Sequence, residues 1–172
     1  MIETVIVAIP MLKQENLVPF IVEKLETKPK KIIVNGTGIY QYHSAVADCG
    51  ITGRKLACDF YSVASPIGGG SPWTKDASKA DVSLNLYARK LAKEFSEKEG
   101  KTVRTELACC IGKSEVSYQI LEPCGTVIEN GTIHLTPEQV RNEFFLHTPI
   151  FTSMATFGLF GEFQRDKQWE LA

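Results

Sequence analysis

The sequence predicts an α/β (α+β) protein in which antiparallel or mixed sheets are covered by helices. Two short apolar stretches, residues 4–10 and 32–35, flank a segment with helical periodicity, which predicts a β-α-β opening. A long amphipathic stretch, residues 83–99, is followed by two apolar segments that a turn at Gly112-Lys113 joins. The 172 residues suffice for one domain, or for two small ones, with a real core.

The N-terminal elements are bounded by clear signals. Residues 4–10 (TVIVAIP) predict a strand, and residues 14–27 predict an amphipathic helix, in which Pro19 is compatible only with the first turn. Residues 32–35 predict a second strand, followed by a turn at residues 35–38 (NGTG).

The next elements alternate in type. Residues 56–63 predict a strand, and residues 83–99 predict a helix that Gly100 ends. One face of this helix is apolar and indicates core packing: Leu84, Tyr87, Ala88, Leu91 and Phe95. Residues 103–112 and 115–122 predict two strands.

The sequence allows two interpretations at the start of the C-terminal part. Residues 126–128 and 131–135 are compatible with a further short strand pair or with an extended loop. A helix is predicted to start at Thr136, because Thr136 and Gln139 form a capping-box pattern and Pro137 occupies the first helical position.

Composition excludes several classes of protein. A net charge of −1 argues against non-specific nucleic-acid binding, and no apolar run approaches the roughly 20 residues of a membrane span. The N-terminus lacks the pattern of a signal peptide. The five cysteines include no C-x-x-C pair, and the neighbours Cys109 and Cys110 would point to opposite faces of a strand. We therefore expect a reduced, cytoplasmic protein with mostly buried thiols.

Residues 48–81 concentrate charge and glycine. Three successive glycines allow close backbone approach to a ligand, and nearby cations are suited to an anion such as a phosphate chain. The acids of the same stretch could hold a divalent cation. A solvated, flexible turn explains the composition equally well. The residues concerned are Asp48, Arg54, Lys55, Asp59, Gly68, Gly69, Gly70, Lys75, Asp76, Lys79 and Asp81.

Neither of two common phosphate motifs accounts for this stretch. The Walker A pattern is absent, since Lys75 follows Trp73-Thr74 and not glycine. The Rossmann fingerprint is absent too, since Gly36-Thr37-Gly38 has no third glycine at the required position.

The order of these residues resembles the C-terminal half of S-adenosylmethionine synthetase (methionine adenosyltransferase). DCGITGRK (48–55), DFY (59–61) and the run from Gly68 to Ser83 follow the family pattern with its spacing, and the tail from Pro149 to Glu170 resembles the family ending. The resemblance implies the family's β-α-β repeats. It divides the chain into a remnant of the central domain (1–36), a crossing strand with the phosphate-binding loop (37–81) and the C-terminal domain (82–172).

The resemblance also implies roles on the phosphate side. Arg54, Lys55 and Lys75 would be phosphate-chain cations, and Lys79 would lie near methionine and the phosphates. Asp81 would bind Mg²⁺, with K⁺ possible through the other half of the site.

On the nucleoside side, Asp48 would contact the ribose and Tyr40 would stack on adenine. Ile111 would line the nucleoside pocket, and Gly68, Gly69 and Gly70 would approach the substrate. Without the resemblance, Tyr40 would be interpreted as a half-buried strand aromatic, and the lysines as solvated charges.

Several features depart from the family pattern. Ile39 replaces the family arginine, residues 42–47 (YHSAVA) replace a glycine-rich run, and Glu162 stands in place of another arginine. The H-P-D-K and G-A-G-D-Q-G motifs of the family's N-terminal half are absent. Three hypotheses follow: a subunit of a split enzyme that uses ATP and L-methionine with a second protein chain, an inactive regulatory pseudo-subunit, and a fragment or isolated phosphate-binding domain without activity of its own.

Overall fold

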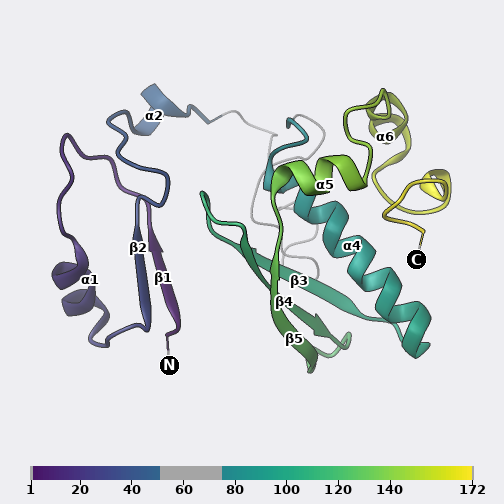
Figure 1. Ribbon diagram of the computed structural model, residues 1–172, viewed down its shortest axis with the longest axis horizontal. Coiled ribbons are helices and arrows are strands. Elements are labelled where there is room, and N and C mark those ends of the chain that lie inside the picture. Colours follow the sequence, from purple (N-terminus) through teal and green to yellow (C-terminus); the bar gives the residue numbers. More distant parts are fainter. Residues whose placement is uncertain (1, 51–74, 172) are drawn as a thin grey trace. The chain divides into compact units, whose positions relative to one another are not determined.

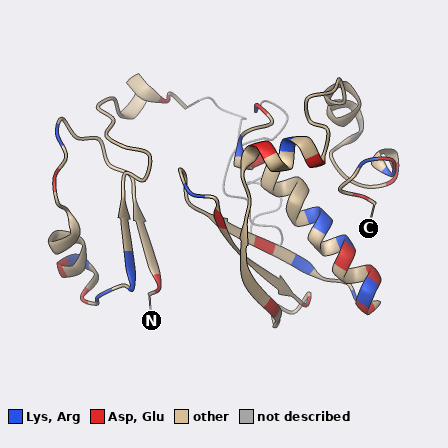
Figure 2. Ribbon diagram, in the orientation of Figure 1, with Lys and Arg blue, Asp and Glu red and all other residues tan. Residues whose placement is uncertain are grey.

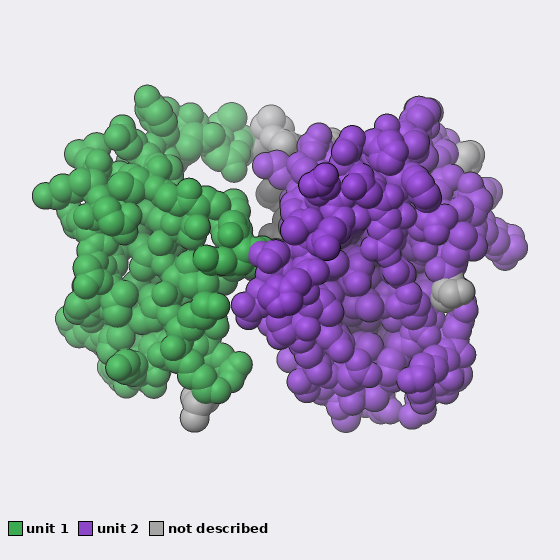
Figure 3. All heavy atoms as spheres, viewed as in Figure 1, with its two compact units in different colours: residues 1–51, 110–113 green, residues 52–109, 114–172 purple. Residues whose placement is uncertain are grey.

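A computed structural model of the chain describes residues 2–50 and 75–171 and divides it into two compact units (Figure 1). Unit 1 consists of Met1–Ile51 with Cys110–Lys113, and unit 2 of Thr52–Cys109 with Ser114–Ala172 (Figure 3). The described residues form one parallel and one antiparallel sheet, accompanied by helices. The predicted α/β class with mixed sheets is thus confirmed.

Unit 1 contains the predicted β-α-β opening. Strand β1 (Thr4–Val7) pairs in parallel with β2 (Lys31–Val34), and helix α1 (Val18–Leu25) connects them. The helix is shorter than the predicted 14–27, with Pro19 in its first turn as expected. A short helix, α2 (Ser44–Ala47), follows where no helix was predicted.

Asn35 extends the contact between β1 and β2 beyond the strands themselves. Its backbone is left-handed (φ 46°), a conformation that asparagine tolerates better than most residues. Its side-chain Oδ1 accepts from the Ile9 amide and its Nδ2 donates to the Ile9 carbonyl, both at 2.8 Å. A buried side chain therefore satisfies the backbone of a residue just past the end of β1.

The sheet of unit 2 is an antiparallel meander. Strands β3 (Arg104–Cys109), β4 (Glu115–Leu121) and β5 (Val127–His134) pair in that order. Both alternatives for residues 126–135, a short strand pair and a loop, were wrong, because β5 is one continuous strand paired with β4.

Gly131 lies within β5, opposite Tyr118 of β4. A Cβ at position 131 would come within 2.9 to 3.1 Å of the Tyr118 ring, so the ring covers the glycine that would otherwise weaken the strand. The Tyr118 hydroxyl then donates to Glu129 at 2.8 Å, on the same strand. The aromatic ring thus allows the strand to continue through a glycine.

The helices of unit 2 start and end at the signals in the sequence. Helix α4 (Ala80–Glu99) lies against β3 and ends at Gly100, whose φ is 67°. Helix α5 (Pro137–Glu143) lies against α4 and starts with the predicted capping box of Thr136 and Gln139. Helix α6 (Phe151–Phe157) and a 3₁₀ turn, η2 (Glu162–Gln164), follow.

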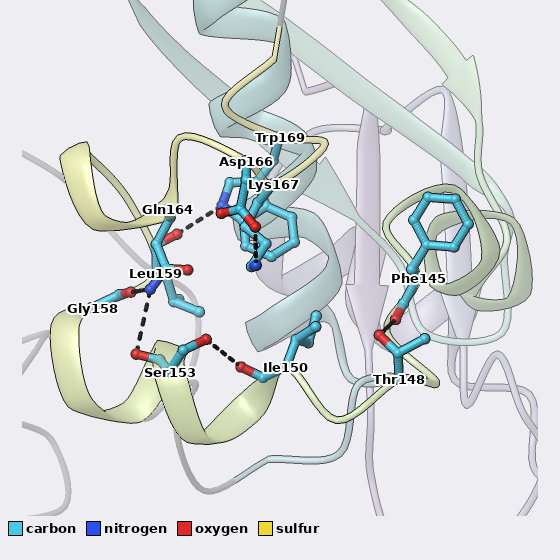
Figure 4. A network of polar contacts seen from close by, with 10 residues as sticks. All are labelled: Phe145, Thr148, Ile150, Ser153, Gly158, Leu159, Gln164, Asp166, Lys167 and Trp169. Atoms are coloured by element: carbon cyan, nitrogen blue, oxygen red, sulfur yellow. Dashed lines mark hydrogen bonds and ion pairs between the residues drawn. The ribbon is translucent and has the colours of Figure 1, made fainter.

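The core of unit 2 forms around Trp169, which is fully buried. Its indole Nε1 donates to the Leu159 carbonyl at 2.7 Å, and the buried Gln164 amide donates to the Gly158 carbonyl at 2.9 Å (Figure 4). Phe144 packs edge-on against the indole with ring centroids 5.8 Å apart. The cluster joins residues from α4, α5, α6 and the C-terminal segment: Ala77, Val82, Leu86, Val140, Phe144, Leu146, Met154, Leu159 and Trp169.

One sequence expectation about the thiols fails. Cys110 is buried, but Cys49, Cys109 and Cys124 are exposed, so most of the described cysteines are not core residues. Their place at turns and near strand ends explains this, because hydrophobicity alone does not bury a residue at such positions. Separately, none of the described helices has the length and apolar character to cross a membrane.

Candidate functional site

The predicted site residues fall into three groups. Lys75, Lys79 and Asp81 belong to unit 2, and Tyr40, Asp48 and Ile111 belong to unit 1. Five predicted residues lie outside the described part of the chain: Arg54, Lys55, Gly68, Gly69 and Gly70. The predicted strand at 56–63, with Asp59, also lies outside it.

Lys75 and Asp81 are brought together at the start of α4. Lys75 Nζ lies 3.9 Å from Asp81 Oδ2, and the two side chains are 33% and 17% exposed. This distance permits an ion pair but is too long for a hydrogen bond. The ammonium and the carboxylate therefore do not hydrogen-bond to each other. A cation and a carboxylate therefore lie side by side at low exposure, both able to bind a further ligand.

The N-terminus of α4 adds a second favourable feature. Lys79 is the N-cap residue, and no side chain caps the first N–H groups of the helix. Unsatisfied N–H groups and the helix dipole favour negative charge at this end. Asp81 lies in this first turn, and an anionic ligand would benefit from the same field.

Asp76 and Ser78 shape the turn that leads into α4. Asp76 Oδ1 accepts from the Ser78 hydroxyl at 2.5 Å and from the Ser78 amide at 2.9 Å, and the Asp76 carbonyl accepts from the Lys79 amide at 2.9 Å. The Ser78 hydroxyl, and after it the Ser78 N–H, lower the pKa of Asp76 below its ordinary value. The sequence interpretation missed this role of Asp76 and Ser78, although an Asp-x-Ser pattern just ahead of a helix is typical of such a turn.

Other charged residues of α4 form ion pairs within unit 2, among them Lys90 with Glu143 of α5. Acidic and basic residues are interspersed along the C-terminal half of α4 (Figure 2). Lys93 pairs with Glu97 at 2.8 Å and Lys90 with Glu94 at 3.4 Å, each four residues apart. Pairs at this spacing stabilise the helix and do not indicate a ligand. The candidate site is therefore confined to the first turn of α4 and the residues just before it.

The described residues of the nucleoside side belong to unit 1. Tyr40 is 40% exposed, and its carbonyl accepts from the Met11 amide at 2.9 Å. It belongs to no strand, so its interpretation as a strand aromatic was wrong. Asp48 is exposed at the end of α2, and Ile111 is 69% exposed. Among the described residues, no hydrogen bond or ion pair joins these three side chains.

The segment that departs from the family pattern has an unusual backbone. Ser44 has a φ of 59°, in the left-handed region that favours glycine. Its hydroxyl lies 2.7 Å from Nδ1 of the preceding His43. The segment that replaces the family's glycine-rich run thus keeps, at Ser44, a backbone conformation suited to glycine.

A metal ion would find one suitable ligand at this site. Within residues 2–50 and 75–171, no group of three or more His, Cys, Asp or Glu side chains could hold a metal. A carboxylate such as that of Asp81 offers the hard oxygen that Mg²⁺ prefers, and Mg²⁺ is commonly bound by one or two carboxylates together with substrate phosphates. The described residues thus fit a Mg²⁺ ion that also needs ligands from elsewhere.

Comparison with known proteins extends these observations. Residues 42–171 match the model of the S-adenosylmethionine synthetase C-terminal domain. Among curated proteins, the S-adenosylmethionine synthase of Zymomonas mobilis is 37% identical over 142 residues, which cover 77% of this chain and 36% of the relative. The synthase of Acholeplasma laidlawii is 35% identical, covering 85% and 42%, and that of Petrotoga mobilis is 31% identical, covering 92% and 42%.

The alignments cover most of this chain but less than half of each relative. The chain spans only about two-fifths of the length of these curated relatives, between 36% and 42%. No solved structure matches the chain.

Proposed function

Because the chain belongs to the S-adenosylmethionine synthetase family, we propose that it is one subunit of a split, hetero-oligomeric methionine adenosyltransferase. The substrates are ATP and L-methionine, and a second protein chain contributes the N-terminal half. Two observations support this: the C-terminal-domain match over residues 42–171, and relatives that are all named S-adenosylmethionine synthases. We place the assembly in the cytoplasm.

In the proposed reaction, the thioether sulfur of methionine attacks C5′ of the ribose and triphosphate departs. The sulfur is already nucleophilic, so catalysis depends on positioning and on stabilising charge as the triphosphate leaves. Lys75 and Lys79 would face this leaving group together with Arg54 and Lys55. Bound Mg²⁺, with Asp81 as one ligand, would neutralise phosphate charge, and any K⁺ would be held through the partner half.

Further residues have predicted roles toward the nucleoside and the phosphate chain. Tyr40 offers an aromatic face for adenine, Asp48 a carboxylate for the ribose hydroxyls, and Ile111 an apolar wall. Gly68, Gly69 and Gly70 would let the backbone approach the phosphate chain.

The observation that carries the proposal is the Lys75–Asp81 pair at the N-terminus of α4. A solvated charge pair would be mostly exposed, but the Asp81 side chain is only 17% exposed. Both residues belong to the matched domain and lie at an uncapped helix end that favours anions. This combination supports a phosphate and metal site better than a solvated turn.

The test measures S-adenosylmethionine formation by the chain with and without a partner. The purified chain, given ATP, methionine and Mg²⁺, should form none. After addition of a chain that carries the H-P-D-K and G-A-G-D-Q-G motifs, produced from the same source organism, the product should appear. Product from the chain alone, or no product from the mixture, would contradict the proposal.

A second candidate function is a catalytically inactive regulatory pseudo-subunit of a full-length synthase. The altered segment favours it, because Ile39, His43 and Ser44 change the adenine side of the expected pocket, and Ser44 retains a glycine-like backbone. In that case the chain would change the rate of a full-length synthase, and the variant Lys75→Ala would change it equally.

A further inference from the structure

The strands of unit 1 are apolar in sequence but are not buried. Six of the eight residues in β1 (TVIV) and β2 (KIIV) are Val or Ile. None of them is buried by the described residues, and Ile6 is 47% exposed. Parallel strands that are apolar throughout normally have both sheet faces covered. The sequence of β1 and β2 is therefore suited to a more enclosed sheet than the two described strands provide.

Unit 1 also lacks a core of its own. Among its described residues only four are buried: Ile21, Pro29, Asn35 and Cys110. Unit 2, by contrast, has a contiguous cluster of nine buried residues around Trp169. A two-stranded sheet with so little burial is marginal in water, since stability depends on buried apolar area.

The geometry identifies the outer edge of β1 as a place where a strand could be added. The carbonyls of Glu3 and Val7 accept from the Lys31 and Asn35 amides at 2.9 and 2.8 Å, so these residues turn their backbone groups toward β2. Successive residues of a strand turn their backbone groups to opposite sides, so Thr4 and Ile6 present theirs at the other edge. No strand in the described part of the chain pairs there.

The comparisons indicate which polypeptide could pair with this edge. The C-terminal-domain match begins only at residue 42, so β1, α1 and β2 precede that domain. The Petrotoga alignment covers 92% of the chain and must therefore extend into residues 1–41. Unit 1 thus extends into a region that precedes this domain in the family, and the alignment covers only 42% of that relative.

We propose that the outer edge of β1 is the docking edge for a β-strand of the chain that carries the N-terminal half of the synthase, and that this strand covers Ile6. Backbone hydrogen bonds to Thr4 and Ile6 would provide affinity, and the apolar side chain of Ile6 would provide specificity. The inference rests on the proposed function, since it names where the second chain of that enzyme binds.

Site-specific cross-linking tests the edge directly. Position 6, and as a control position 12, would carry p-benzoylphenylalanine in the full chain, expressed in the source organism. Leu12 is a suitable control because it is 85% exposed and belongs to no strand. After irradiation, mass spectrometry should find position 6 joined to a protein with the H-P-D-K motif, at a yield at least about tenfold above that of position 12.

The other cross-linking outcomes overturn the proposal. A cross-link from position 6 to a second copy of this chain would make the edge a homodimer contact. A cross-link to residues 51–74 of the same chain would show that the chain covers its own edge. No cross-link above that of position 12 would show that the edge has no partner.

Substitution provides an independent measurement. Ile6→Lys should weaken binding of the H-P-D-K-containing chain about tenfold or more, because it places a charge in the contact, and Leu12→Lys should change it less than about twofold. Circular dichroism of each variant alone would show whether the fold is retained. Cross-linking at position 6 with no S-adenosylmethionine produced would overturn the proposed function alone, whereas production of S-adenosylmethionine without that cross-link would overturn only the docking edge.

Discussion

Arg89, midway along α4, holds the carboxylate of Glu170 through two parallel hydrogen bonds. Nε and Nη2 donate to Oε1 and Oε2 at 2.9 and 2.8 Å, and the Gly161 amide donates to Oε1 at 3.0 Å. The Glu170 side chain is only 6% exposed, so this bidentate contact fastens the C-terminal segment to the longest helix of unit 2.

Removing the guanidinium should therefore destabilise unit 2. Arg89→Ala leaves a nearly buried carboxylate with one donor, and we expect it to lower the free energy of unfolding by about 1–3 kcal/mol in urea titrations. Arg165→Ala is the matched control, because its pair with Glu162 is 3.3 Å long with both side chains about three-quarters exposed, and it should change little. Equal urea concentrations at the unfolding midpoint for the two variants would refute the role of the Arg89 contact.

The Asn35 side chain should be needed for the order of the segment after β1. Asn35→Gly retains the left-handed backbone but removes both hydrogen bonds to Ile9, so the Ile9 amide should exchange with deuterium faster by about one to two orders of magnitude. Glu26→Gly is the control, because Glu26 also has a positive φ (51°) but ends α1 on the surface, and it should leave Ile9 unaffected. Unchanged exchange at Ile9 in the Asn35 variant would count against this interpretation.

The Tyr118 phenol should ionise at a higher pH than an ordinary tyrosine. Its hydrogen bond to Glu129 raises the pKa of Tyr118 above the ordinary tyrosine value, with lesser contributions from partial burial and from the charge of Glu129. Because the folded-state pKa is the higher one, the stabilisation is complete below the unfolded-state pKa and is lost as pH rises through the folded one. In ultraviolet titrations Glu129→Gln should shift the Tyr118 transition to lower pH, and Tyr118→Phe identifies that transition by removing it.

In the assembled enzyme, Lys75→Ala should lower turnover more than it weakens ATP binding. Its charge is needed most as the triphosphate departs, so we expect a loss of about 10² to 10³ in kcat, or about 2–4 kcal/mol in the barrier. Lys98→Ala removes an equal charge from an exposed pair with Glu99 on the same helix and should leave kcat unchanged. An unaltered rate for Lys75→Ala would show that Lys75 lies away from the reacting groups.

Asp81→Asn should raise the Mg²⁺ concentration required for half-maximal rate. The substitution keeps the shape of the side chain but removes the charge of a hard oxygen ligand. Asp166→Asn is the control, because Asp166 is an exposed residue that pairs with its neighbour Lys167. A Mg²⁺ dependence that is the same in both variants would exclude Asp81 as a metal ligand.

Local signals predicted those parts of the fold that depend on neighbouring residues. The capping box at Thr136 and the end of α4 at Gly100 were both predicted, because a few adjacent residues determine each. Strand β5 was not predicted, because its continuity depends on the Tyr118 ring covering Gly131 from another strand. The role of Asn35 was missed for the same reason, since its partner Ile9 is 26 residues away.

The candidate site was predicted in a similar way. The resemblance identified Lys75 and Asp81 by their order in the motif, and the structure brings them within ion-pair distance. It could not indicate that Asp76 and Ser78 shape the turn before α4, because that depends on side-chain hydrogen bonds to the backbone. The predicted roles of Tyr40, Asp48 and Ile111 stay predictions.

The burial of Trp169 affects when unit 2 can finish folding during its synthesis. A ribosome synthesises α4 and the three-stranded sheet before Trp169, whose indole fills the centre of the core. Until then Leu86 and Phe144 lack their final neighbour, and the growing polypeptide exposes apolar surface of the kind that chaperones bind. Folding of this unit should therefore be completed only after translation has passed residue 169.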